Sequence, residues 1–201
     1  MCGGWACQCN PPKHFYEYKG KPLIQRTIEL LQKYGVDDIA ITTSPNRVEL
    51  YEQFGVEVIP YEANNVPFVW LDAFYPTDEP VCYIFGDVVF SVGAIRTIVD
   101  TKTNDIEFFA SAPPFAPDYP KKWAEPFAFK VMDQKRFRTC IEQTKLFTER
   151  GTWYRHPIAW ELWQVIKGTA PNHIIYTNYT AINDFTCDID YAEELDQWKT
   201  T

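Results

Sequence analysis

Apolar positions in the first half of the chain follow two alternating periods, one typical of helices and one typical of strands. Residues 21–34 carry apolar side chains at helical spacing, with Pro22 in the first turn and Gly35 as the C-cap, which predicts a helix. Further helices are expected over 46–54 and 66–75, between short apolar runs that predict strands at 38–43, 56–60 and 81–86. This alternation indicates βαβ units and a parallel sheet.

The pattern loosens in the second half. The expected elements are helices over 92–101, 134–148 and 157–167, and strands over 105–110, 127–131 and 174–176. The alternation at 127–131 is also compatible with an antiparallel strand. A loop with four prolines occupies 112–120. No linker, repeat or low-complexity segment interrupts the chain, so residues 1–201 are expected to form a single domain.

The stretch 81–91 is the most informative part of the sequence. Its apolar run reads as a strand buried on both faces, and Gly86-Asp87 interrupts it. Ligands of open α/β sheets bind outside the carboxyl ends of the strands, where Asp87 is expected. Gly86 permits a turn and the close approach of a ligand. A carboxylate there suits a hard cation that also holds phosphate oxygens, although a strand end followed by a turn aspartate gives the same pattern.

Both ends of the chain also carry candidate residues. Near the C-terminus, Asp190 followed by Glu193 resembles a capping box, which assigns Asp190 a structural role and leaves Asp188 free for another one. The alternative for Asp188 is a solvated strand-end residue. At the N-terminus, Gly3 and Gly4 leave backbone N–H groups free to surround an anion, or else belong to a frayed terminus.

Composition narrows the range of partners. A hydrophobic content of 46% supports a sizeable core, and a net charge of −8 without a Lys/Arg block argues against a nucleic-acid partner. No apolar run reaches the length of a membrane span, and no signal peptide is evident. The six cysteines are scattered, which is typical of reduced thiols in a cytoplasmic protein. Cys2, Cys7 and Cys9 lack the paired spacing of a zinc site.

Four motifs taken in order resemble those of the MobA-like NTP transferases, the sugar-phosphate nucleotidyltransferase superfamily with a GT-A fold. The motifs are Gly3-Gly4 with Pro12-Lys13, then Gly20-Lys21-Pro22-Leu23, Gly86-Asp87, and Asp188-Ile189-Asp190. The resemblance spans nearly the whole chain. It implies a three-layer, Rossmann-like α/β fold with a mixed, mainly parallel sheet flanked by helices. Residues 1–105 would form the nucleotide-binding half and residues 106–201 the acceptor-binding half.

The chemistry that the resemblance implies is attack of an acceptor phosphate on the α-phosphorus of a nucleoside triphosphate, with release of pyrophosphate. Asp87 and Asp188 would hold one Mg²⁺, and Lys13 would neutralise phosphate charge. Gly3, Gly4 and Gly86 would surround the nucleotide. The protein's contribution to such a transfer is mainly to position groups and stabilise charge.

The acceptor, a phosphorylated small molecule, is expected in the second half of the chain. Glu125-Pro126 resembles the Glu-Pro element of the family's acceptor pocket, and Trp123 and His156 lie near it in sequence. An aromatic face such as that of Trp123 suits a sugar or a choline-like group. Ordinary packing for the tryptophan, and a loop hydrogen bond for His156, are the alternatives.

Two departures from the family pattern leave other functions open. Ala6-Cys7-Gln8 follows the glycines where the family carries an Arg or Lys, so a nucleotide- or sugar-binding relative with weak catalysis is an alternative. The family also begins with an apolar strand that leads into the glycine loop, whereas this sequence begins inside the loop, so the first strand is either truncated or encoded upstream. A glycosyltransferase of the same fold is the third reading, but Gly86-Asp87-Val88-Val89 lacks the Asp-x-Asp motif of those enzymes.

Overall fold

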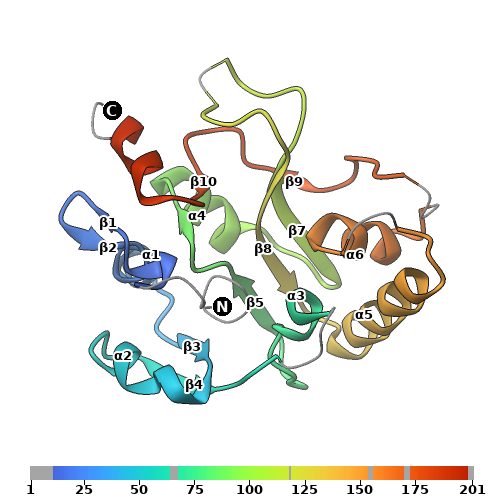
Figure 1. Cartoon of the computed structure of the whole chain (residues 1–201), viewed down its shortest axis with the longest axis horizontal. Helices are drawn as coiled ribbons and strands as arrows, with labels where there is room; N and C mark the ends of the chain where they lie inside the picture. Colours follow the sequence, from blue (N-terminus) through green and yellow to red (C-terminus); the bar gives the residue numbers. More distant parts are fainter. Residues whose placement is uncertain (1–10, 64–67, 118, 154–155, 170–172, 199–201) are drawn as a thin grey trace.

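The structure is a computed structural model that describes residues 11–63, 68–117, 119–153, 156–169 and 173–198 (Figure 1). Gly3, Gly4 and the expected first strand lie outside the described residues. None of the helices in these described ranges combines the length and the apolar content needed to cross a bilayer.

The described chain opens with a short helix and a tight hairpin. The 3₁₀-helix η2 (Lys13–Phe15) precedes strands β1 (Glu17–Tyr18) and β2 (Lys21–Pro22), which pair antiparallel. Lys19 and Gly20 both have positive φ, of 52° and 75°, as a two-residue hairpin turn of this kind requires. Helix α1 (Leu23–Lys33) follows, and Gly35, with φ 78°, lies beyond its end as predicted.

A βαβ unit comes next. Strands β3 (Ala40–Thr43) and β4 (Glu57–Pro60) pair in parallel, and η3 (Pro45–Arg47) with α2 (Val48–Glu52) connects them. This confirms the predicted parallel unit. Its core is small and consists of four buried residues: Ile24 and Ile28 from α1, Ile41 from β3 and Tyr51 from α2. These buried residues hold the N-terminal segment against the sheet.

The second sheet is larger and mixed. Its order is β5-β8-β7-β9, with β8 antiparallel to β5 and β7, and β9 parallel to β7. The strands are β5 (Val81–Ile84), β7 (Ile106–Ser111), β8 (Glu125–Val131) and β9 (Thr180–Ala181). The antiparallel pairing of β8 agrees with its weak alternation. Helices α3 (Val69–Asp72) and α4 (Val92–Asp100) flank β5 in sequence.

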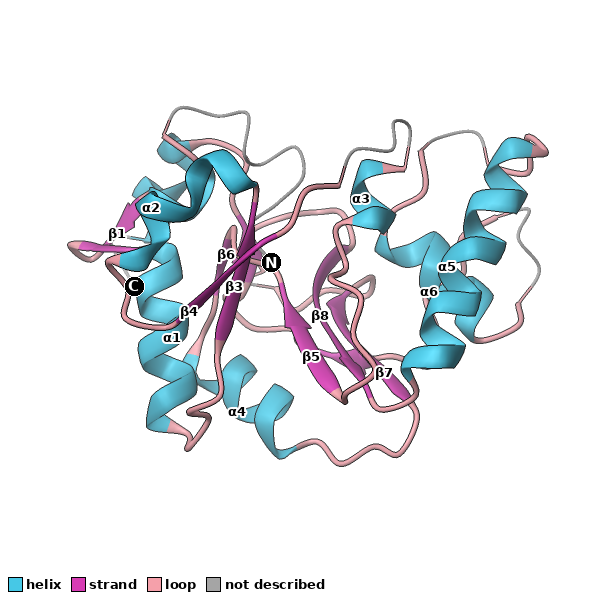
Figure 2. Ribbon diagram, turned by 90° about the horizontal axis from the view of Figure 1, so that it is seen from below, coloured by secondary structure: helices cyan, strands magenta, loops and turns pink. Residues whose placement is uncertain are grey.

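Helices cover both sides of the strands, as Figure 2 shows: α1 and α2 lie on one side, and α5 (Gln134–Glu149) and α6 (Ala159–Ile166) lie on the other. Aromatic rings fill the space under α6. Phe108 stacks on Phe129 with ring centroids 4.4 Å apart, and the rings of Trp160 and Trp163 pack against Phe108 at 4.9 and 5.5 Å. The expected layered α/β fold is confirmed.

The strand predicted at 174–176 is wrong. This segment is irregular and lies against α6, where the side chain of Gln164 satisfies its backbone groups. Gln164 Nε2 donates to the carbonyl of His173 at 2.5 Å, and Ile175 N–H donates to Gln164 Oε1 at 3.2 Å. Tyr176 packs edge-on against Trp160 at 4.7 Å. The apolar residues of this run therefore pack on a helix rather than pair in a sheet.

Candidate active site

Asp87 and Asp188 meet because two short strands pair. Gly86 and Asp87 form a turn between β5 and β6 (Val88–Val89), and β10 (Cys187–Asp188) runs antiparallel to β6. Asp188 lies opposite Val88, and Ile189 N–H donates to the carbonyl of Asp87 at 2.8 Å. Two aspartates from distant parts of the sequence are thereby placed near each other.

A polar clamp at the start of α4 fixes the approach to β10. Ser91 Oγ accepts from Ala94 N–H at 2.8 Å as the N-cap of α4, and donates to Asp184 Oδ2 at 2.5 Å. Thr186 N–H donates to Asp184 Oδ1 at 2.8 Å, and Ser91 N–H donates to Thr186 Oγ1 at 3.1 Å. The sequence analysis did not single out this clamp, although a serine directly before the helix expected over 92–101 is a signal that could have indicated it.

Lys13 joins the two aspartates from the N-terminal segment. Its Nζ lies 2.8 Å from Asp190 Oδ1, and its side chain is 17% exposed. Burial opposes the charge, but the hydrogen bond with Asp190 and the charges of Asp87 and Asp188 outweigh burial and raise the pKa of Lys13. The ammonium is therefore fully charged at neutral pH and faces the carboxylates.

The carboxyl of Asp87 lies in an environment that disfavours a bare negative charge. Burial raises its pKa, the neighbouring charge of Asp188 raises it further, and the charge of Lys13 opposes this shift. In the described parts of the chain, no group of three or more His, Cys, Asp and Glu residues is arranged to hold a metal ion. Two carboxylates nonetheless fit Mg²⁺, which keeps several waters and binds through one or two carboxylates together with substrate phosphates.

A second lysine, Lys121, enters the cluster from the loop between β7 and β8, the yellow loop at the top of Figure 1. It forms a short hydrogen bond with Asp188 Oδ1, and its Nζ lies 3.5 Å from Glu125 Oε1. Burial disfavours its charge, but Asp188 outweighs burial and raises the pKa of Lys121. Glu125 is 3% exposed. Burial, reinforced by Asp188 and opposed by Lys121, raises the pKa of Glu125 to about 9.

The structure changes the role expected for Asp190. Its carboxylate contacts Lys13 at 2.8 Å and Lys121 at 3.6 Å. Its backbone N–H donates instead to Glu194 Oε2 at 2.8 Å, near the start of η4 (Ala192–Trp198), so Glu194 rather than Glu193 reaches back to the backbone. Asp190 therefore belongs to the charged cluster, and the capping box predicted from its spacing with Glu193 is wrong.

The three residues expected to bind the acceptor differ in their surroundings. Glu125 contacts Lys121, and the ring of Trp123, 56% exposed, has its centroid 5.4 Å from Lys121 Nζ. His156 is exposed and precedes α6. Within the described ranges we find no contact between His156 and the charged cluster. Glu125 and Trp123 thus both contact Lys121 of the charged cluster. The role of His156 stays a prediction.

His14 supports Lys13, and the sequence analysis assigned it no role. It is 1% exposed, and its Nδ1 lies 3.0 Å from Tyr51 Oη of α2. Burial lowers the pKa of His14 to about 3, and the positive charges of Arg47 and Lys13 act in the same direction. A neutral, buried His14 therefore ties η2 to the βαβ unit. Lys13 is held in place by its neighbour in sequence.

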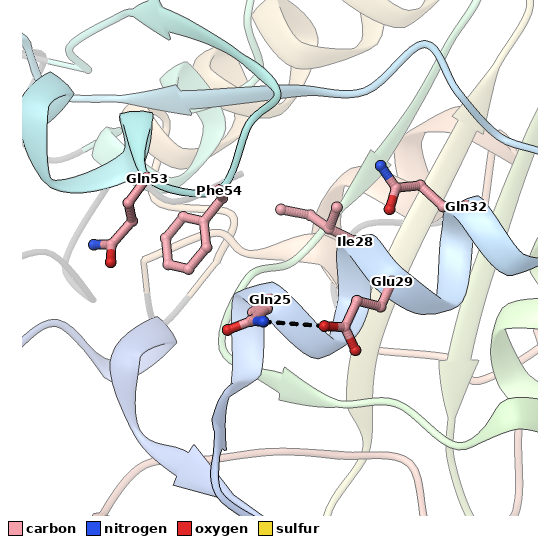
Figure 3. Close-up of a pocket in the computed structure, with 6 residues that line it drawn as sticks. All are labelled: Gln25, Ile28, Glu29, Gln32, Gln53 and Phe54. Atoms are coloured by element: carbon pink, nitrogen blue, oxygen red, sulfur yellow. Dashed lines mark hydrogen bonds between the residues drawn. The ribbon is translucent and has the colours of Figure 1, made fainter.

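A pocket of about 260 Å³ lies elsewhere, between α1 and α2 (Figure 3). Gln25, Ile28, Glu29, Gln32, Gln53 and Phe54 line it. Gln25 Nε2 donates to Glu29 Oε1 at 3.0 Å, and Gln53 Nε2 donates to the carbonyl of Leu50 at 2.7 Å. Much of its polar lining is thus already paired. None of its lining residues belongs to the charged cluster.

Comparison with protein-family models shows which family the chain belongs to. The profile described as the MobA-like NTP transferase domain matches residues 1–151. The chain belongs to this family. The match includes Lys13, Asp87 and the loop with Lys121, whereas Asp188 lies beyond it. The resemblance drawn from the four motifs is confirmed.

Solved structures show the same fold at low sequence identity. The inositol-1-phosphate CTP transferase from T. maritima is 18% identical, with 98% of this chain and 94% of that chain covered and a TM-score of 0.53. A putative glucose-1-phosphate thymidylyltransferase from Bacillus anthracis, in complex with a sucrose, is 16% identical, with 99% and 92% covered and a TM-score of 0.59. The 4-diphosphocytidyl-2C-methyl-D-erythritol synthase from Anaerococcus prevotii is 10% identical, with 94% and 93% covered and a TM-score of 0.58. No curated protein matches the chain by sequence.

Proposed function

We propose that the protein is a Mg²⁺-dependent nucleotidyltransferase that joins a nucleoside triphosphate to a sugar phosphate or a similar phosphorylated acceptor. The observation that carries the proposal is the meeting of Lys13, Asp87 and Asp188, from three separate parts of the sequence, in one partly buried cluster. Membership of the MobA-like NTP transferase family supports the reaction class. The relatives that act on CTP or on sugar phosphates are similar in fold, and they suggest the substrate class.

In the proposed reaction, an oxygen of the acceptor phosphate forms a bond to the α-phosphorus. The bond between the α-phosphorus and the bridging oxygen breaks, and its electron pair leaves with pyrophosphate. Asp87 and Asp188 would hold Mg²⁺, which when bound neutralises charge on the reacting phosphates. Lys13 would contribute a compact positive charge to the same phosphates, and its contact with Asp190 orients it.

The remaining predicted residues complete the proposal. Gly3, Gly4 and Gly86 would contribute backbone groups to the nucleotide site. Glu125, Trp123 and His156 would bind the acceptor, in the half of the chain from 106 to 201. Residues 1–105 would bind the nucleotide within the same single domain. Trp123 is well placed for such a role, because its exposed face lies next to the charged cluster.

A panel of nucleoside triphosphates and acceptors tests the proposal. The protein is incubated with each triphosphate and with sugar phosphates or phosphocholine, and released pyrophosphate is measured with Mg²⁺ and with excess EDTA. We expect release that requires both an acceptor and Mg²⁺. Nucleotide binding without pyrophosphate release from any pair would instead favour the weakly catalytic relative.

A further inference from the structure

The ammonium of Lys121 lies among four acidic side chains. It hydrogen-bonds closely to Asp188 Oδ1, while Glu125 Oε1, Asp190 Oδ2 and Glu194 Oε2 lie 3.5, 3.6 and 3.8 Å from its Nζ. The Lys121 side chain is 4% exposed. A lysine buried this deeply is stable only when carboxylates compensate its charge. Its closest partner is an aspartate to which the proposed function assigns a metal ion.

The chain around Lys121 shows that this burial is specific to one position. The next residue, Lys122, carries the same charge and is exposed. Lys121 is buried, and its ammonium lies 5.4 Å from the ring centroid of Trp123. The loop therefore buries Lys121 and leaves Lys122 in solvent.

A metal ion and this ammonium would share the carboxylate of Asp188. Mg²⁺ binds carboxylate oxygens at about 2.0–2.1 Å and tolerates little distortion of its geometry. Lys121 already occupies Asp188 Oδ1. Two cations on one carboxylate, a few ångströms apart in a partly buried site, repel each other strongly. Full occupancy of Asp188 by both is therefore unfavourable.

We propose that Lys121 is a resident counter-ion of Asp188 that a divalent metal ion must displace. This rests on the metal assignment of the proposed function. The displaced ammonium does not need to reach solvent, because Glu125, Asp190 and Glu194 already lie within 3.8 Å of it. Metal binding then exchanges one partner of Lys121 for the others. Lys121 acts through Asp188 and is a positioning residue that sets the metal affinity of the substrate-free protein.

Metal affinity without nucleotide tests the competition directly. Mg²⁺ and Mn²⁺ binding is measured by calorimetry, and Mn²⁺ binding also by electron paramagnetic resonance, on the wild type, Lys121→Gln and Lys122→Gln. Lys121→Gln removes the competing charge, so we expect its metal affinity to rise by at least about tenfold. Lys122→Gln is the matched control, since it removes an equal charge from an exposed neighbour, and its affinity should stay within about twofold of the wild type.

A charge-preserving variant covers the case in which Lys121→Gln fails to fold. Arg holds carboxylates more firmly than Lys through its paired donors, so Lys121→Arg should bind metal more weakly than the wild type. Unchanged or weaker binding by folded Lys121→Gln, or equal or tighter binding by Lys121→Arg, would overturn the proposal.

The variant Asp188→Asn separates this proposal from the one on which it rests. Loss of metal binding in Asp188→Asn with unchanged affinity in Lys121→Gln would overturn the counter-ion role alone. Unchanged metal affinity in Asp188→Asn would overturn the metal assignment and the counter-ion role together. The predicted result is loss of binding in Asp188→Asn and a gain in Lys121→Gln.

Discussion

Protonation of His14 should destabilise the segment that carries Lys13. His14 is buried, its Nδ1 lies 3.0 Å from Tyr51 Oη, and burial lowers its pKa to about 3 from an ordinary value of 6.5. Arg47 and Lys13 add positive charge nearby, which also disfavours the imidazolium. Since His14 and Lys13 are consecutive residues of η2, a charged His14 should weaken the placement of Lys13.

The size of the effect follows from the two pKa values. Between pH 6.5 and about pH 3 the unfolded chain binds a proton at His14 that the folded protein does not bind. Stability from this group is therefore fully present above pH 6.5 and is lost as the pH falls toward 3. At pH 5 the loss relative to neutral pH should be about 2 kcal/mol, since each pH unit within this window contributes about 1.4 kcal/mol.

Urea unfolding at pH 7 and pH 5 measures this loss in the wild type, in His14→Gln and in His156→Gln. His14→Gln should be less stable than the wild type at pH 7, because a buried contact is altered. Between pH 7 and pH 5, its free energy of unfolding should fall by about 2 kcal/mol less than that of the wild type. His156→Gln removes an exposed histidine and should follow the wild type. Equal pH dependence in the wild type and His14→Gln would refute the reasoning.

Four further variants probe other parts of the structure. Asp188→Asn should abolish metal binding. Asp190→Asn should keep metal binding but raise the KM for the nucleotide and lower the free energy of unfolding by about 1 kcal/mol, because it weakens the pairing of Lys13. Calorimetry and steady-state kinetics distinguish the two variants, and the reverse pattern would contradict the assignment. Phe108→Ala removes a fully buried ring and should cost about 3–5 kcal/mol in urea unfolding, and a cost below about 1 kcal/mol would contradict its place in the core. Trp123→Ala should raise the KM for the acceptor about fivefold without changing the KM for the nucleotide, and an unchanged KM for the acceptor would remove Trp123 from its site.

The sequence was most informative where a local signal fixes a local structure. Pro22 and Gly35 mark the start and the end of α1, and both lie where their backbone preferences require. The position of Asp87 after a strand was evident because an apolar run followed by Gly-Asp has few other structures. Its proximity to Asp188 followed from the family resemblance, since the pairing of β6 with β10 is non-local.

Features that depend on tertiary contacts could not be predicted from the sequence. Lys121 and Lys122 are identical neighbours, and only the packing of the loop decides that the first is buried among acidic side chains. The spacing of Asp190 and Glu193 suggested a cap, but the lysines attract the carboxylate of Asp190 and Glu194 reaches the backbone instead. The apolar run at 174–176 predicts a strand, because the run itself does not reveal that the side chain of Gln164 hydrogen-bonds to its backbone.

Pyrophosphate release by Asp87→Asn is the most direct measurement of the central claim. The substitution keeps the size of the side chain but removes the charge of one proposed metal ligand, so metal-dependent turnover should fall below detection while the melting temperature changes little. Asp100→Asn is the matched control, because Asp100 is exposed and pairs only with the exposed Arg96 within the described residues, and it should keep wild-type turnover. Wild-type pyrophosphate release by Asp87→Asn, at the same Mg²⁺ concentration, would contradict the account.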